Sequence, residues 1–146
     1  MNQKPFNVAV DDLKRTGARY ESMRVHFERV CAQAKLLAEG PESPLRGFLR
    51  TEMDHGALLL AINDRRLRIS LQYDRKTERG VLYVEDESAV GPGRVPETIE
   101  RIPFNGLGET GLAREDGDQL HLGLAADCLT LVARLVDTAL DRDPWK

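Results

Sequence analysis

The chain has 146 residues and a formal net charge of −3, with 41% hydrophobic and 31% charged residues. Single cores commonly hold about 100–200 residues, and this composition excludes wholesale disorder. Charges of both signs are interspersed, without the basic stripe that marks a general nucleic-acid binder. We therefore predict a single globular domain over residues 1–146, with no attraction to an anionic membrane surface.

Two cysteines are present, Cys31 and Cys128, and both stand among apolar helical positions. Two cysteines in this setting do not indicate a disulfide scaffold and are typical of a protein from a reducing compartment. The N-terminus lacks the apolar core of a signal peptide, and no run reaches about 18 apolar residues. We expect a cytoplasmic protein with two free thiols.

Residues 1–40 are predicted to be helical. Apolar side chains recur at alternating steps of three and four residues, which places them on one stripe of a helix. This stripe consists of Tyr20, Met23, Phe27, Val30, Ala34 and Leu37. Leu13 and Thr16 extend the spacing backwards. Because Gly17 weakens a helix by about 1 kcal/mol relative to Ala, the element is either one long helix or a short piece from Val8 followed by a main helix from Ala18.

A connector is predicted over residues 41–56. Gly40 suits the left-handed cap of a helix, and Pro41 cannot continue one. Within the connector, Leu45 to Met53 holds either a short strand or an irregular segment.

Residues 57–122 are predicted to form an antiparallel sheet. From Arg66 to Asp74, polar and apolar residues alternate strictly, which is typical of a half-buried strand. The apolar side of this strand consists of Leu67, Ile69, Leu71 and Tyr73. Ala57–Asn63 before it and Val81–Glu85 after it are joined to it by short turns, which favours a three-stranded meander.

Residues 88–103 are predicted to be a loop or a short helix. Pro96 suits the first position of a helix over Glu97–Ile102, because its missing N–H costs nothing there. A strand is the competing prediction, and Pro103 is expected to end either element.

A hairpin and a helix complete the chain. Gly111–Arg114 and Gln119–Leu122 are predicted strands around Asp116-Gly117, a strong hairpin signal. Residues 123–142 form the clearest helix. Its apolar face consists of Leu124, Cys128, Leu131, Val132, Leu135, Val136 and Ala139. The predicted fold is α+β, an antiparallel sheet of about five strands with a long N-terminal helix and a C-terminal helix packed on one face.

This order of elements is similar to that of small dimeric bacterial secretion chaperones. The layout they share is a first helix, a three-strand meander, a short helix, a hairpin and a last helix. The resemblance is carried by Ala57–Glu85, Pro96–Ile102 and Gly111–Leu140, whereas the long helix before Gly40 departs from it. It is a resemblance of layout rather than of motifs, and it implies a dimeric, protein-binding chain.

No catalytic, cofactor or metal signature is recognised. The glycines of residues 106–111 match a dinucleotide motif, but the helix that the motif requires does not follow, so turn positions are expected. His26, His55 and His121 lack metal-ligand spacing. His26 is predicted to be solvated and His121 to face the polar side of its strand. A site that combines His55 and His121 with one carboxylate stays the ligand-binding or enzymatic alternative; its candidates are Asp54, Asp116 and Asp118.

Basic residues gather around one predicted hairpin. They are Arg65, Arg66, Arg68, Arg75, Lys76 and Arg79. Such a ribbon can grip phosphates, but Asp64, Asp74 and Glu78 are interleaved with it, and aromatic residues for base stacking are missing. We favour a charged edge that resists strand addition, then contact with an acidic protein partner, then nucleic acid. The excess of arginine, sixteen against five lysines, is ascribed to a GC-rich bacterial genome.

The first helix is expected to be longer than the sheet beneath it, at roughly 45 Å. We therefore predict a homodimer through this helix. Tyr20 and Phe27 are predicted partner-contact residues, in addition to the arginines named above. Trp145 either covers the end of the sheet or contacts another chain. The predicted function is a non-enzymatic bacterial protein-binding module, such as an adaptor, chaperone or inhibitor. The alternatives are a nucleic-acid-associated regulator using the Arg65–Arg79 hairpin, and a small ligand-binding or enzymatic domain around His55 and His121.

Overall fold

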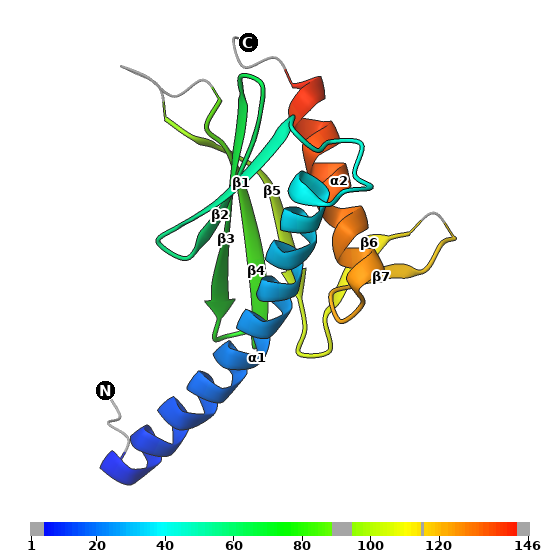
Figure 1. Ribbon diagram of the computed structural model, residues 1–146. Coiled ribbons are helices and arrows are strands. Elements are labelled where there is room, and N and C mark those ends of the chain that lie inside the picture. Colours follow the sequence, from blue (N-terminus) through cyan, green and yellow to red (C-terminus); the bar gives the residue numbers. More distant parts are fainter. Residues whose placement is uncertain (1–4, 89–94, 115, 143–146) are drawn as a thin grey trace.

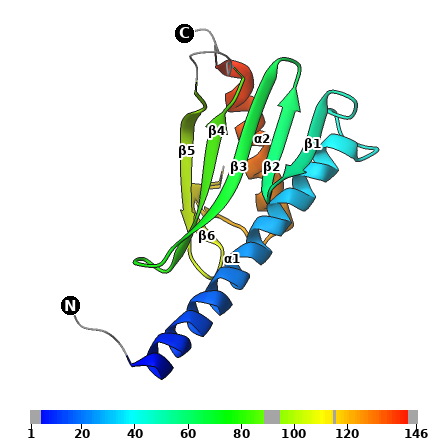
Figure 2. The ribbon, with the colours of Figure 1, turned by 90° about the vertical axis from the view of Figure 1, so that its left-hand side faces the viewer.

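A computed structural model describes residues 5–88, 95–114 and 116–142 (Figure 1). The predicted contact at Trp145 lies outside these residues. The elements in chain order are α1 (Phe6–Glu39), β1 (Leu49–Asp54), β2 (Ala57–Ile62), β3 (Arg65–Asp74), β4 (Arg79–Asp86), β5 (Glu97–Phe104), β6 (Glu109–Ala113), β7 (Gln119–His121) and α2 (Ala125–Asp141). Both helices lie on one side of the main sheet, and Figure 2 shows the opposite side open. The α+β prediction is confirmed.

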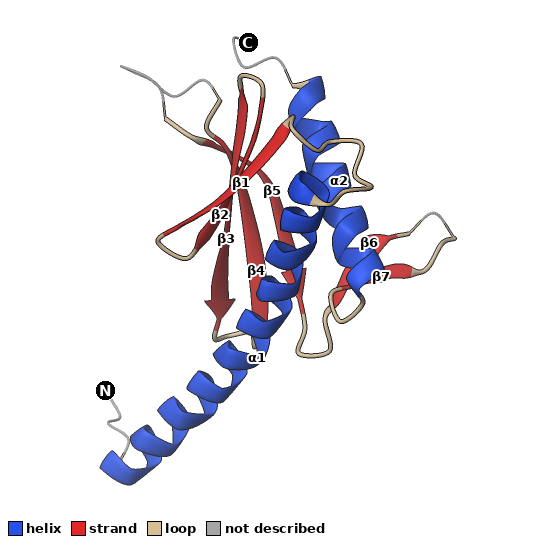
Figure 3. Ribbon diagram, in the orientation of Figure 1, coloured by secondary structure: helices blue, strands red, loops and turns tan. Residues whose placement is uncertain are grey.

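The main sheet is an antiparallel meander of five strands in the order β1-β2-β3-β4-β5. The predicted central meander corresponds to β2, β3 and β4. The two hairpin strands that we had counted among the five form a separate two-stranded sheet, β6-β7 (Figure 3). Their places in the main sheet are taken by β1 and β5.

Strand β1 lies within the predicted connector 41–56 and corresponds to the short strand that was one of the two alternatives for Leu45–Met53. Leu49 is buried and pairs with Ile62 of β2. The turn between the strands is His55-Gly56, with φ angles of 48° and 81°. Positive φ at both positions is the requirement of the two-residue hairpin turn that matches strand twist. The pairing with an apolar neighbour therefore decides the structure of a mostly polar segment.

Strand β5 replaces the loop or short helix predicted over residues 88–103. Pro103 does not end it; it pairs with Val81 at the edge of the sheet, where a missing N–H is tolerated. Ile102 and Phe104 are buried. The competing prediction of a strand is the correct one.

The core lies between the apolar face of the sheet and the two helices. Leu67 and Ile69 are fully buried, and Leu71 and Tyr73 pack against them at the border of the core. The helices contribute Met23, Phe27, Val30, Ala34, Cys128, Leu131, Val132, Leu135 and Val136. The predicted stripes thus pack on the same face of the sheet, that of α1 from Met23 onward and that of α2 from Cys128 onward.

Candidate functional site

The N-terminal part of α1 extends beyond the sheet, as the blue end of the helix shows in Figures 1 and 2. We call residues 6–20 the projecting segment. None of its residues is buried, whereas the buried residues of α1 begin at Met23. Helix formation across Gly17 shows that α1 is one continuous helix and not two pieces.

The apolar stripe of α1 continues through the projecting segment. Phe6, Leu13 and Tyr20 are 85%, 62% and 40% exposed. Ala9 and Thr16 stand between them, so steps of three and four lead without interruption to Met23. At 100° per residue, the charged residues of the segment lie off this line; they are Asp11, Asp12, Lys14, Arg15 and Arg19. The face that covers the chain's own core therefore extends beyond that core.

Arg19 marks the place where the projecting segment leaves the folded body. It forms an ion pair with Glu78 in the turn between β3 and β4. Hydrogen bonds to Glu78 and Tyr73 raise the pKa of Arg19. The base of the segment is thus fixed to the sheet by a charged contact.

The two contact residues predicted on the helix differ in their exposure. Tyr20 is accessible, but Phe27 is 4% exposed and belongs to the core. Phe27 is therefore not available for a partner in this structure. The residues that sequence reasoning did not single out are Phe6 and Ala9, although the same spacing reaches them.

The arginines predicted to form one cluster are distributed over the length and both faces of β3. Pairing places Arg65 at one end of the β3–β4 ribbon and Arg79, opposite Asp74, at the other. Ten residues of strand span roughly 30 Å. Arg75 follows in the turn at the far end. The cluster that the sequence suggested is therefore not one surface.

Arg66 and Arg68 lie on the open face, where carboxylates match their charge. Arg68 donates to Asp54 at 2.9 Å, and this hydrogen bond lowers the pKa of the Asp54 carboxyl. Arg66 Nε lies 3.4 Å from a carboxylate oxygen of Glu87. Two of the arginines on which the nucleic-acid alternative depends are thus engaged by acidic neighbours.

Arg65 occupies the opposite face of β3 from Arg66. Its side chain is 18% exposed, and its Nε lies 3.7 Å from Asp64 Oδ1. Alternation along the strand directs it toward the side that carries Leu67. Arg65 therefore does not share a face with Arg66 and Arg68.

His26 is buried, which corrects the prediction of a solvated position. Its Nε2 lies 3.0 Å from the carbonyl oxygen of Gly106, and its Nδ1 lies 3.1 Å from Arg29 Nη1. Because arginine can only donate, Nδ1 accepts and Nε2 donates, as in neutral imidazole. The ring also packs edge-on against Phe104, with centroids 5.9 Å apart. His26 therefore fastens α1 to the turn between β5 and β6.

His55 and His121 do not share a site. Figure 1 shows the β1–β2 turn and β7 on opposite sides of the molecule. The His55 side chain is 91% exposed, and Nδ1 of His121 accepts the Gly123 N–H at 3.1 Å. Among the described residues, no three His, Cys, Asp or Glu side chains are grouped to hold a metal ion.

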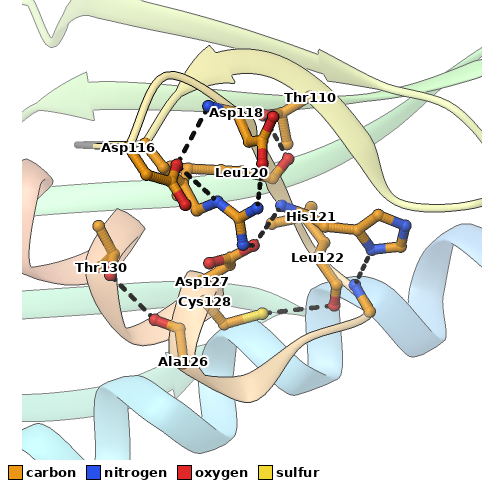
Figure 4. A network of polar contacts seen from close by, with 12 residues as sticks. Thr110, Asp116, Asp118, Leu120, His121, Leu122, Ala126, Asp127, Cys128 and Thr130 are labelled. Carbon is orange, nitrogen blue, oxygen red and sulfur yellow. Dashed lines mark hydrogen bonds and ion pairs between the residues drawn. The ribbon is translucent and has the colours of Figure 1, made fainter.

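A polar network joins the β6–β7 hairpin to the start of α2 (Figure 4). The Arg114 guanidinium lies 3.4 Å from Asp116, 3.3 Å from Asp118 and 3.4 Å from Asp127. Asp127 is 5% exposed and also accepts the His121 N–H at 2.9 Å. In the first turn of α2 its negative charge is favoured by the helix dipole. The guanidinium is surrounded by the carboxylates, so the network is a structural clamp.

Gly108 lies in the turn before β6 with a φ angle of 91°, whereas Gly111 lies inside β6 with a φ angle of 76°, where the pairing with β7 is irregular. The segment leads into a strand and not into the helix that a dinucleotide site requires. The cysteines also belong to the framework: both are free, and burial raises the pKa of each thiol to about 11. A thiol with such a pKa is largely protonated at neutral pH and is a poor nucleophile.

Within the described residues, no helix has the length and apolar character needed to cross a membrane. Comparison of the chain with protein-family models, curated proteins and solved structures finds no match. The surfaces of the chain itself therefore carry the functional argument.

Proposed function

We propose that this protein is a non-enzymatic binding module that engages another protein chain through the projecting segment of α1. The observation that carries the proposal is the uninterrupted apolar stripe, whose members Phe6, Leu13 and Tyr20 are exposed beyond the core. Rows of exposed apolar side chains mark interaction sites on soluble proteins. Each large side chain contributes about 1.5–3 kcal/mol when fully buried.

The spacing of the stripe defines the kind of partner. Apolar side chains at steps of three and four pack against a second helix or into an apolar groove of helix length. The segment carries Asp11, Asp12, Lys14, Arg15 and Arg19, so neither sign of charge prevails by more than one. Binding should therefore depend weakly on salt, in contrast to binding of phosphates.

Adaptors, chaperones and inhibitors all act by such binding, and the bacterial setting inferred from arginine usage is part of the same proposal. A role on nucleic acid receives less support. Arg66 and Arg68 are engaged by Glu87 and Asp54, and the arginines are divided between two ends of a ribbon.

The test is capture of the partner by wild type and by Leu13→Asp. Leu13 is 62% exposed, so the variant should keep its fold, which far-UV circular dichroism checks. Lys14→Ala is the control, because Lys14 lies beside the stripe and not on it. A protein recovered in stoichiometric amount with wild type and Lys14→Ala is then purified, and its affinity is measured.

We expect Leu13→Asp to weaken that affinity at least tenfold, whereas Lys14→Ala leaves it within about twofold. These values follow from the free energy of one buried leucine, since about 1.4 kcal/mol is tenfold. Equal affinity for wild type and Leu13→Asp would show that the partner binds elsewhere, and the proposal would be abandoned.

A further inference from the structure

The outer edge of β1 is a second open surface, and Figure 2 shows β1 at the margin of the sheet. The β1–β2 hairpin has a two-residue turn, so Asp54 and Ala57 beside the turn form a hydrogen-bonded pair. Alternation along β1 then directs the N–H and C=O groups of Met53, Thr51 and Leu49 outward. Of these, the Leu49 N–H is used by the carbonyl of Leu45 at 3.0 Å.

The side chains of β1 are symmetric in character about Thr51. Arg50 and Glu52 flank it on the open face of the sheet, and Leu49 and Met53 flank them on the helix side. Arg50 and Glu52 are both exposed, and neither side chain has a hydrogen bond or ion pair with another described residue. Met53 is 53% exposed. An antiparallel copy of the same strand would meet this edge with opposite charges.

We infer that two copies of this chain pair through β1, antiparallel about a two-fold axis at Thr51, and so join their sheets into one. In this register each Thr51 lies opposite the other, each Arg50 lies opposite a Glu52, and each Leu49 lies opposite a Met53. Opposite charges directly across an antiparallel pair are favourable, as are paired threonines. A symmetric pair uses the same patch twice, which is the commonest way for chains to dimerise.

The hydrogen-bonding parity of β1 agrees with this register. Thr51 directs its backbone groups outward, so two facing threonines form a pair that exchanges both N–H···O bonds. A shift by one residue would place outward groups of one strand against inward groups of the other. The hairpin turn thus permits this alignment and those shifted by two residues, and the charge pattern distinguishes among them, because the shifted registers place Arg50 opposite Arg50 or Glu52 opposite Glu52.

A hollow beside β1 offers room for the second copy. It measures about 360 Å³ on the helix side, and its lining includes Cys31, Lys35, Glu39, Met53 and Leu58. Leu49 and Met53 of a paired strand would point to this same side. Lys35 and Glu39 are a further opposite-charge set without a partner among the described residues. The β1 edge therefore has a hollow on the helix side of the sheet and charged side chains on the open face.

This dimer goes beyond the proposed function and leaves the projecting segments free. In Figure 2 the projecting segment and β1 lie at opposite ends of the molecule. In this arrangement the homodimer predicted from the sequence forms at β1 in preference to α1.

The test is the molar mass in solution, by light scattering and sedimentation, of wild type, Arg50→Glu, Glu52→Arg and the double reversal. Wild type should reach twice the 16.4 kDa of the chain. Each single reversal turns two attractive contacts into two repulsive ones, and we expect a dissociation constant raised about tenfold. The double reversal restores opposite charges across the axis and should return the constant to within about threefold.

Oxidative crosslinking checks the register. Facing residues of a hydrogen-bonded pair have Cα atoms about 5.5 Å apart, which suits a disulfide. Thr51→Cys should therefore give a crosslinked dimer, and Met53→Cys should not, because its equivalent in the second copy lies four positions away. Both variants retain Cys31 and Cys128, so crosslinking through the native cysteines would appear equally in both.

Three results would overturn the inference: a wild-type mass of one chain at every concentration, a dimer indifferent to Arg50→Glu, or equal crosslinking of the two cysteine variants. A dimer lost in Leu13→Asp but kept in Arg50→Glu would assign self-association to α1. Partner capture through the projecting segment is a separate readout, so either proposal can fail without the other.

Discussion

Replacement of Gly80 by alanine should destabilise the fold through a single buried contact. Gly80 of β4 lies opposite Phe104 of β5. A Cβ at Gly80 would meet Phe104 Cζ at 2.5 Å and Cε1 at 2.8 Å, whereas carbon atoms in contact prefer about 3.5–4.0 Å. Phe104 is 1% exposed, and His26 packs against its ring. The ring therefore has to move by about 1 Å inside a packed core.

The expected cost is about 1–2 kcal/mol. Overpacking costs about 1–3 kcal/mol, and alanine returns about 0.4–1 kcal/mol by restricting the unfolded chain. Urea unfolding should show a lower midpoint at an unchanged slope. Phe104→Leu removes the ring atoms that clash, so Gly80→Ala should cost less than half as much in that background.

Gly17→Ala is the matched control. A Cβ there has nothing within 4 Å, and Gly17 lies inside α1, so the same substitution should stabilise the helix by about 1 kcal/mol at most. If Gly80→Ala is as stable as wild type, or if its cost is the same with Leu at position 104, the steric reasoning is refuted.

Three further predictions concern stability and reactivity. Burial acts to raise the pKa of Asp86, but hydrogen bonds from Ser88 and Arg142 outweigh burial, and the pKa is lowered in the folded protein. The ionised Asp86 carboxylate therefore stabilises the fold above about pH 4, and this contribution is lost as the pH falls through the folded pKa. Asp86→Asn should therefore flatten the acid limb of a stability profile, and an unchanged limb would contradict this. His26→Ala removes the bond to Gly106 and should cost about 2–3 kcal/mol in thermal unfolding; a loss below about 0.5 kcal/mol would show that the ring is not a fastener. Because burial raises the pKa of Cys128 to about 11, iodoacetamide at neutral pH should label it only on unfolding, and rapid labelling of the native protein would refute its burial.

The sequence predicts the elements whose pattern is local. The alternation in Arg66–Asp74 and the stripes of α1 and α2 suffice because each element buries one periodic face. Strands β1 and β5 lack such a signal. β1 buries Leu49 beside a buried neighbour strand, and β5 tolerates Pro103 only because it lies at the edge of the sheet.

The positions of the candidate site residues were harder to predict, because they depend on contacts between segments that are far apart in the sequence. His26 binds a carbonyl 80 residues away in the chain. The separation of the arginines follows from the register of β3 with β2 and β4. The projecting segment is the opposite case. Its apolar stripe can be recognised in the sequence, and only the exposure of that stripe had to be learned from the structure.

Hydrogen exchange of the protein, alone and with its captured partner, tests the central claim most directly. In the free protein the amides of residues 6–20 should exchange faster than those from Met23 onward, since only the latter belong to the buried part of α1. Binding should slow exchange in residues 6–20 more than anywhere else. Unchanged exchange there, with protection confined to the β3–β4 hairpin or another surface, would contradict binding through the projecting segment.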